Sequence, residues 1–325
     1  MNFDFPVKEE ITICFAHVAY QLESEFESRN TGIRNFQVRT SNGLMTRMPE
    51  TDVLVVSGLW DNSLLEHSDR LSYIQSIGAG FDQFPVDELR SRNIRLSHAS
   101  GVNSNAVSEH AMAMILSFSR QIHLARDNQR RHFWRGMISE VREREDELEG
   151  KTVGIIGLGT IGSRVAKLCK AFGMNVLATR QDVSKGGEMV DLLLPSDRYR
   201  ELVADSDFII LTCPLNDQTY QIISKESLQL MKRSAFLINV ARGQCVDEGA
   251  LMYALRNKLI AGAGLDHFVD DPLKSDSPLW DIDNVIITPH TGGETRLYEK
   301  NIVDILVNNL DRLWKSEMDL INQVV

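Results

Sequence analysis

The sequence predicts an α/β protein of two doubly wound domains, each built around a parallel sheet. Its 325 residues exceed one average domain. Short apolar runs alternate with helical patterns along nearly the whole chain, and no internal repeat or low-complexity stretch interrupts them. The hydrophobic share of 43% and the charged share of 25% are ordinary for a globular protein, so a disordered or fibrous chain is excluded.

The first hundred residues contain apolar runs that are typical of buried parallel strands. They lie at 11–15, 52–56 and 73–77, and a polar or glycine-bearing turn closes each. A turn-rich stretch at 99–105 follows, which we interpret as a hinge, and a helix is predicted after it. The apolar face of that helix consists of Val107, Ala111, Met114, Ile115, Phe118 and Ile122.

From Lys151 the alternation becomes regular, which predicts a second doubly wound sheet. Its strands are expected near 152–156, 175–179, 207–212, 235–240, 261–265 and 284–288. A second hinge is predicted at 291–293, and a last amphipathic helix begins near Asn301. The simplest assembly returns this helix to the first domain. We therefore expect a domain of residues 102–290 to be inserted into a domain formed by residues 1–101 and 291–325.

Charge and cysteine content exclude several classes of protein. The net charge is −10, and the sequence has no stripe of Lys and Arg residues that could bind a phosphate backbone. No nucleic-acid partner is therefore expected. The first residues lack a signal-peptide pattern and no window approaches 18 uninterrupted apolar residues, so we predict a cytoplasmic protein without membrane contact. No disulfide framework and no metal site are expected, because the cysteines are far apart. They are Cys14, Cys169, Cys213 and Cys245.

The strongest local motif is a GxGxxG sequence that follows a predicted strand and begins a helix. It consists of Gly157, Leu158, Gly159, Thr160, Ile161 and Gly162. Gly157 permits the tight turn, Gly159 lets a pyrophosphate approach the backbone, and Gly162 allows close packing of helix and strand. The alternative is a purely structural turn. The context favours a dinucleotide-binding Rossmann domain.

The second strand of this domain indicates which dinucleotide binds. It ends at Thr179 and is followed by Arg180, where an NAD site usually has a carboxylate for the ribose 2′-hydroxyl. A guanidinium instead suits a 2′-phosphate, and Lys185 lies close behind. We therefore expect NADP(H) to be favoured over NAD(H). The alternative is a solvated Arg180, with Asp182 nearer to the ribose.

Three candidate catalytic residues follow strands of the same domain, where ligands bind in open α/β sheets. Arg242 can hold a carboxylate and polarise a neighbouring carbonyl. His290 can give or take a hydroxyl proton near neutral pH. Asp271 can orient the imidazole and stabilise its charged form.

These motifs together resemble the D-isomer-specific 2-hydroxyacid dehydrogenases over nearly the whole chain. The matching segments are 77–82, 108–110, 157–162, 239–243, 264–266 and 288–293. The resemblance implies a Rossmann cofactor domain inserted into a flavodoxin-like substrate domain, with the substrate between them. It also implies that backbone amides of Gly78, Ala79 and Gly80 bind the substrate carboxylate with Arg242, and that the region around Phe133 and Trp134 packs across a homodimer. The further cofactor contacts expected are Thr179, Cys213, Pro214, Val240, Ala241, Arg242, Asp266, His290 and Gly292.

The sequence departs from the family pattern at two positions, and His267 is also unusual. The family's catalytic Glu-Pro pair is Asp271-Pro272 here, and Arg180 replaces the acidic ribose ligand. We expect His267 to be a packed or surface histidine. The function predicted is an NADP(H)-preferring oxidoreductase that transfers a hydride between nicotinamide and C2 of a 2-hydroxyacid or 2-oxoacid. The alternative is a corepressor-like protein that senses a dinucleotide with little turnover.

Overall fold

The computed structural model describes residues 5–317 and 319–325. The chain divides into two compact units. The first unit is formed by Met1–Asn103 together with Thr295–Val325, and the second by Ser104–Glu294. In the described residues, no helix is long and apolar enough to span a membrane. All four cysteines are free and buried, and burial raises the pKa of Cys14 and Cys169 to about 12.

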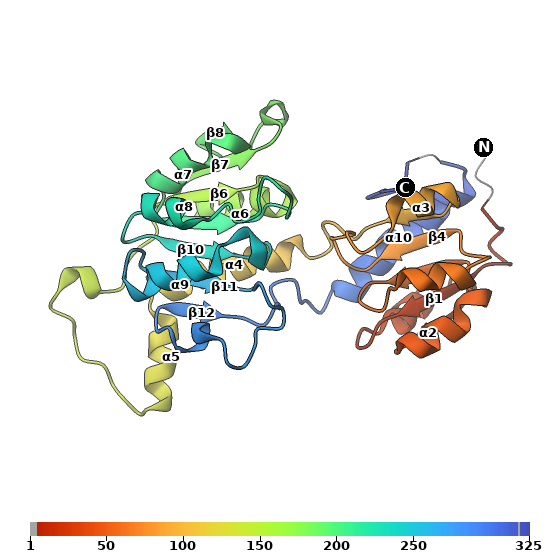
Figure 1. The fold of residues 1–325 in the computed structure, drawn as a ribbon, viewed down its shortest axis with the longest axis horizontal. Helices are drawn as coiled ribbons and strands as arrows, with labels where there is room; N and C mark the ends of the chain where they lie inside the picture. The colour runs from red at the N-terminus through yellow and green to blue at the C-terminus, as the bar shows by residue number, and fades with distance from the viewer. Residues whose placement is uncertain (1–4, 318) are drawn as a thin grey trace. The chain divides into compact units, whose positions relative to one another are not determined.

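The first unit contains a parallel sheet with the strand order β2-β1-β3-β4-β5 (Figure 1). Its strands are β1 (Thr12–Ala16), β2 (Arg34–Val38), β3 (Val53–Val56), β4 (Tyr73–Ser76) and β5 (Arg95–Ser97). Its α-helices are α1 (Leu22–Glu27), α2 (Ser41–Arg47), α3 (Val86–Ser91) and α10 (Tyr298–Trp314). Every residue of β1, β3 and β4 is buried, including the polar Gln75 and Ser76 of β4, as expected for a parallel sheet that is covered on both faces. The strand order is the flavodoxin-like one.

The second unit contains a larger parallel sheet with the order β12-β11-β10-β9-β6-β7-β8. Its strands are β6 (Thr152–Ile156), β7 (Asn175–Arg180), β8 (Leu192–Pro195), β9 (Phe208–Leu211), β10 (Phe236–Asn239), β11 (Gly262–Leu265) and β12 (Val285–Ile287). Its α-helices are α4 (Ser104–Ser119), α5 (Ile122–Arg130), α6 (Thr160–Ala171), α7 (Tyr199–Asp205), α8 (Lys225–Leu230) and α9 (Glu248–Arg256). The two parallel sheets confirm the predicted fold class.

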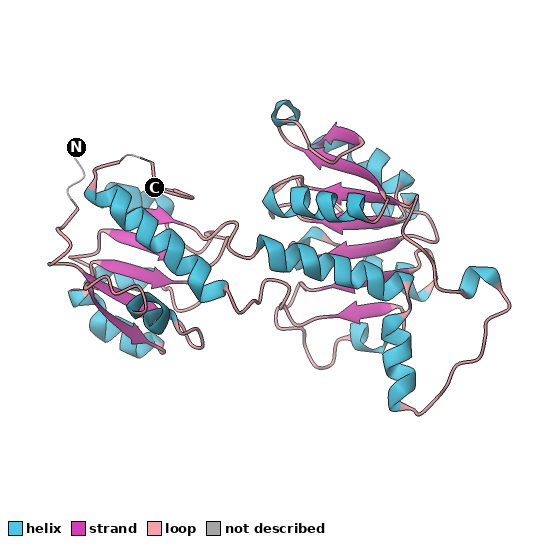
Figure 2. Ribbon diagram, turned by 180° about the vertical axis from the view of Figure 1, so that it is seen from behind, coloured by secondary structure: helices cyan, strands magenta, loops and turns pink. Residues whose placement is uncertain are grey.

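Helices cover both faces of this second sheet, and the order of its strands fixes where a ligand can bind. One apolar cluster joins α4 and α6 to the sheet, and another joins α7, α8 and α9 to it. Figure 2 shows helices in front of and behind the strands of this sheet. The chain runs from β6 outward to β8 and then returns to β9 on the other side of β6. Ligands in doubly wound sheets bind at the carboxyl ends of the strands beside such a reversal. The predicted cofactor and catalytic residues follow β6, β7, β9, β10, β11 and β12 at this edge.

A long exposed segment joins α5 to β6 in the second unit. It runs well away from the sheet as an extended loop with one short turn (Figure 1). Residues 140–147 are largely exposed, as expected for a solvated connection. Several large apolar side chains in the same segment are also exposed. They are Phe133 at 59%, Trp134 at 95%, Met137 at 103% and Val141 at 69%.

Candidate active site

The turn between β6 and α6 has the shape that a bound pyrophosphate requires. Gly157 has a φ of +102°, and a Cβ at this position would lie 2.7 Å from the backbone of Cys213. A Cβ at Gly162 would lie 2.4 Å from the carbonyl oxygen of Gly157, so this glycine lets α6 pack directly against the turn. A Cβ at Gly159 would meet no atom within 4 Å. The backbone at Gly159 is therefore open to a ligand, which fits a dinucleotide.

A cavity of about 890 Å³ lies beside this turn. The predicted cofactor residues that line it are Gly157, Leu158, Gly159, Thr179, Arg180, Cys213 and Pro214. Other predicted contacts lie outside its lining. Thr160, Ile161 and Gly162 form the first turn of α6, and Val240, Ala241, Arg242, Asp266, His290 and Gly292 follow the strands β10, β11 and β12.

The charged side chains in the lining of this cavity are three cations and two carboxylates. The cations are Arg180, Lys185 and Arg200, and the carboxylates are Asp182 and Asp197. Arg180 is the last residue of β7 and donates from Nη1 to the carbonyl of Gly186 at 2.8 Å. Asp182 accepts hydrogen bonds from the hydroxyl and amide of Ser184, and these bonds lower its pKa. Both Arg180 and Asp182 therefore line the cavity, and the charged side chains of its lining carry a net positive charge.

The turn after β10 presents Arg242. Asn239 fixes this turn, because its side chain donates to the carbonyl of Arg242 at 2.9 Å and accepts from the amide of Ala241 at 3.0 Å. A Cβ on Gly243 would come within 1.9 Å of the carbonyl carbon of Phe268. Only glycine therefore lets this turn approach the loop that follows β11, which carries His267 and Asp271.

The carboxylate of Asp266, at the end of β11, holds the segment that carries His290. It accepts hydrogen bonds from the hydroxyl of Thr288 at 2.6 Å and from the amides of Thr291 and Gly292 at 2.9 Å. A Cβ on Gly292 would lie 2.7 Å from Asp266 Oδ2, so the close approach requires glycine. His290 itself has a φ of +54°, an uncommon conformation for a residue with a side chain. The anchoring on either side stabilises this conformation.

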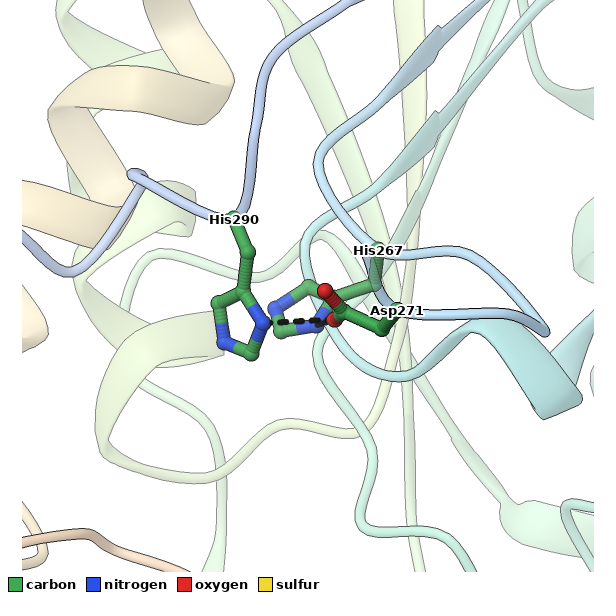
Figure 3. Close-up of side chains that lie close together, drawn as sticks. All are labelled: His267, Asp271 and His290. Atoms are coloured by element: carbon green, nitrogen blue, oxygen red, sulfur yellow. Dashed lines mark hydrogen bonds and ion pairs between the residues drawn. The ribbon is translucent and has the colours of Figure 1, made fainter. Parts of the chain in front are cut away.

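His290 and Asp271 form a hydrogen-bonded pair (Figure 3). Nδ1 of His290 lies 2.6 Å from Oδ2 of Asp271. Because an ionised carboxylate can only accept, Nδ1 carries the proton, and Nε2 is left to give or take one. The two side chains are 52% and 35% exposed, so a substrate can reach them. The side chain of Asp271 thus reaches the imidazole of His290.

His267 is buried behind this pair, with 8% of its surface exposed. Its ring centroid lies 3.9 Å from that of His290, and its Nδ1 lies 3.9 Å from Asp271 Oδ2. Burial lowers the pKa of His267 to about 4, and the positive charges of His290 and Arg242 add to this shift. The carboxylates of Asp266 and Asp271 oppose it. His267 is therefore neutral near pH 7.

The loop after β4 in the first unit presents unused backbone donors. Within the described residues, the amide groups of Gly78, Ala79 and Gly80 donate to no protein acceptor. The carbonyl of Gly78 accepts a hydrogen bond from the amide of Ala99 at 2.9 Å, and this bond holds the loop in place. Three consecutive free N–H groups can bind an anion such as a carboxylate.

The structure assigns contacts to two histidines that received no catalytic role from the sequence. His110, on α4, contacts the hydroxyl of Thr288 through Nε2 at 2.9 Å and lies 3.6 Å from Asp266. It therefore supports the segment that carries His290. His267 contacts the catalytic candidates directly. No local pattern identifies either contact, because both depend on segments far apart in the sequence.

Comparison with known proteins identifies the relatives of this arrangement. The profile of the D-isomer specific 2-hydroxyacid dehydrogenase NAD binding domain matches residues 112–292. A glyoxylate reductase of Thermococcus litoralis is 35% identical over 297 residues, with 87% of each chain covered. A structure of an NADPH-dependent glyoxylate/hydroxypyruvate reductase from Sinorhizobium meliloti, with NADP and malonate, aligns with a TM-score of 0.79 and 25% identity over 98% of this chain and 97% of that one. An acyclic imino acid reductase in complex with NADPH and D-Arg aligns with a TM-score of 0.83 and 26% identity over 97% of this chain and all of that one.

Proposed function

Because the chain belongs to the D-isomer-specific 2-hydroxyacid dehydrogenase family, and is thus an NAD(P)-dependent oxidoreductase, we propose that it is an NADPH-preferring reductase of a small 2-oxoacid. The main support for this reaction is the 2.6 Å hydrogen bond between Asp271 and His290. The pair lies at the carboxyl edge of the sheet, beside the turn that presents Arg242. Two of the relatives are named as reductases of glyoxylate or hydroxypyruvate, which supports a small 2-oxoacid as the substrate.

Each catalytic candidate has a role that its chemistry allows. Arg242 holds the substrate carboxylate and polarises the neighbouring carbonyl. His290 gives its Nε2 proton to the carbonyl oxygen in reduction and takes it back in oxidation. Asp271 holds the ring in the required tautomer and stabilises its charged form. We further assign the free amides of Gly78, Ala79 and Gly80 to carboxylate binding.

The glycine turn and its cavity would hold the cofactor, which supplies or accepts the hydride when bound. The open backbone at Gly159 and the N-terminus of α6 suit the pyrophosphate. Arg180, Lys185 and Arg200 suit a 2′-phosphate. Two of the similar solved structures hold NADP or NADPH, which supports the same preference here.

Steady-state assays test this function. The purified protein should oxidise NADPH in the presence of a panel of oxoacids that comprises glyoxylate, hydroxypyruvate, pyruvate and a bulkier acid. We expect kcat/KM to be highest for one of the small acids. Tight NADPH binding without turnover across the whole panel would contradict the proposal and support a dinucleotide sensor.

The cofactor preference depends on Arg180. A charge-assisted contact to the 2′-phosphate stabilises the complex by roughly 1.5–3 kcal/mol, which corresponds to about 10- to 150-fold in affinity. The wild type should show higher kcat/KM with NADPH than with NADH, and Arg180→Asp should reverse this order. Arg198→Asp is the matched control, because Arg198 pairs with Glu201 outside the cavity lining. Equal or better kcat/KM of the wild type with NADH would exclude the preference.

We also propose that the protein is a homodimer that buries the exposed segment after α5. Phe133, Trp134 and Met137 form an apolar surface that a monomer would leave in water. Trp134→Ala should weaken the dimer about 30-fold or more, because a buried aromatic anchor stabilises an interface by about 2 kcal/mol or more. Val18→Ala, at another exposed apolar residue, is the control. Sedimentation equilibrium measures the dissociation constants, and a monomeric wild type at micromolar concentration would exclude this assembly.

A further inference from the structure

The proposed mechanism does not use the buried ring of His267, yet this ring completes a cluster of three metal-binding side chains. Nδ1 of His267 lies 3.9 Å from Oδ2 of Asp271, and the same oxygen lies 2.6 Å from Nδ1 of His290. One ligand atom from each residue lies within 4.8 Å of the others (Figure 3). The three side chains converge on one point from the loop after β11 and the segment after β12.

We propose that His267, Asp271 and His290 bind a divalent transition-metal ion such as Zn²⁺, and that an ion bound there stops turnover. Two imidazoles and one carboxylate are ligands that this class of ion prefers. Three protein ligands with one open position are also the arrangement of many accessible zinc sites. The fourth position can be filled by water, because the side chains of His290 and Asp271 are 52% and 35% exposed.

The geometry of the cluster requires only small movements to coordinate the ion. Zinc bonds of about 2.0–2.2 Å in a tetrahedron separate the ligand atoms by about 3.3 Å. Asp271 and His290 must therefore move apart by less than about 1 Å, and His267 must approach Asp271 by a similar distance. The ligand nitrogens of His267 and His290 lie within 4.8 Å of each other and must approach by up to about 1.5 Å. The exposure of Asp271 and His290 leaves room for this adjustment.

A second carboxylate lies near the other ring nitrogen of His267. Nε2 of His267 lies 3.8 Å from Oδ2 of Asp266. Asp266 is 2% exposed at its side chain and is fixed by its bonds to Thr288, Thr291 and Gly292. Histidines that bind metals usually direct the other ring nitrogen toward a carboxylate, which sets the ring orientation. Nε2 of His267 thus lies close to an anchored carboxylate, at a distance longer than a hydrogen bond.

A metal ion in this place would block both directions of the reaction. It would take the position of the proton between His290 Nδ1 and Asp271, and its positive charge would replace that of the imidazolium. Nε2 would then keep the single remaining ring proton, so His290 could neither act from the imidazolium form nor accept a proton. The metal site itself is independent of the proposed function, whereas the loss of turnover rests on it.

Direct binding tests the site first. Protein treated with EDTA and desalted is titrated with Zn²⁺ by isothermal calorimetry. We expect one ion per chain in the wild type and a weakening of at least about 100-fold in His267→Phe, since even changes to residues behind the ligands cost 10- to 100-fold. His67→Phe, which removes an exposed imidazole of the first unit, should leave the affinity unchanged. His267→Leu provides a second variant if Phe disturbs the packing.

Activity tests the consequence. Zn²⁺ should inhibit NADPH oxidation by the wild type and by His67→Phe, and EDTA should restore the rate. In His267→Phe the inhibition constant, measured against that variant's own metal-free rate, should rise at least about 100-fold. Equal Zn²⁺ affinity in the wild type and both His267 variants would overturn the site, and binding at this site without inhibition would overturn the proposed effect. If no oxoacid is reduced, the proposed function fails while the calorimetric comparison still decides the site.

Discussion

Replacement of His290 by Gln should lower kcat by at least about 10²-fold in both directions, because general acid-base catalysis by a positioned side chain contributes about 10²- to 10⁴-fold. The Gln side chain is about as long as that of His, but its amide does not gain or lose a proton near neutral pH. Its amide can still hydrogen bond to Asp271, so the local packing should be largely retained. The loss should therefore appear in kcat, with little change in the affinity for NADPH.

Two measurements separate this effect from general damage. NADPH binding, followed by the fluorescence of the cofactor, should be unchanged within about twofold in His290→Gln. His123→Gln is the matched control, because His123 contacts the carbonyl of Ser117 in the same unit and belongs to no part of the proposed site. A His290→Gln enzyme that kept most of its kcat would remove His290 from the mechanism.

The buried strands of the fold could be predicted from the sequence, whereas of the four edge strands only β12, expected near 284–288, could be. Strands β1, β3 and β9 are largely apolar because both faces of the sheet are covered, whereas β4 is fully buried although it includes Gln75 and Ser76. Strands β2 and β8 lie at sheet edges and are only partly buried, and β2 carries polar residues such as Arg34 and Asn35. Strand β5, also at an edge, has only three residues. Periodicity does not distinguish such short or polar segments from loops.

The same reasoning explains which parts of the site were predictable. Parallel strands end at one edge of a sheet, so residues that follow them, such as Arg242 and His290, could be expected near one another. The contact of His267 with His290 was not predictable, because it depends on the path of the loop after β11. That path requires the close approach of Gly243 to Phe268, which no local pattern encodes. The contact of His110 with Asp266 could not be predicted either, because these residues lie on segments far apart in the sequence.

The length of the side chain at position 271 distinguishes this site from the usual Glu-Pro pattern. Asp271 already lies at hydrogen-bond distance from His290, at 2.6 Å. An added methylene extends the side chain by about 1.5 Å. In Asp271→Glu the carboxylate must therefore fold back or push the imidazole away. Since a misplacement of about 1 Å can cost on the order of 10²-fold in rate, we expect kcat to fall by about that factor.

Asp271→Asn keeps the length of the side chain, removes its negative charge and adds an amide group that can donate a hydrogen bond. Its amide can donate to Nδ1 of His290, which would place the ring proton on Nε2 and fix the tautomer that cannot act as a base. It also removes the negative charge that stabilises the imidazolium. We expect kcat to fall by about 10²- to 10⁴-fold, while KM for the oxoacid changes little, because Arg242, the proposed carboxylate ligand, is untouched. Steady-state kinetics of the two variants in both directions measure these effects, with Asp270→Asn as the control at an exposed neighbour. Higher activity in Asp271→Glu, or an unchanged kcat in Asp271→Asn, would show that Asp271 does not act through His290.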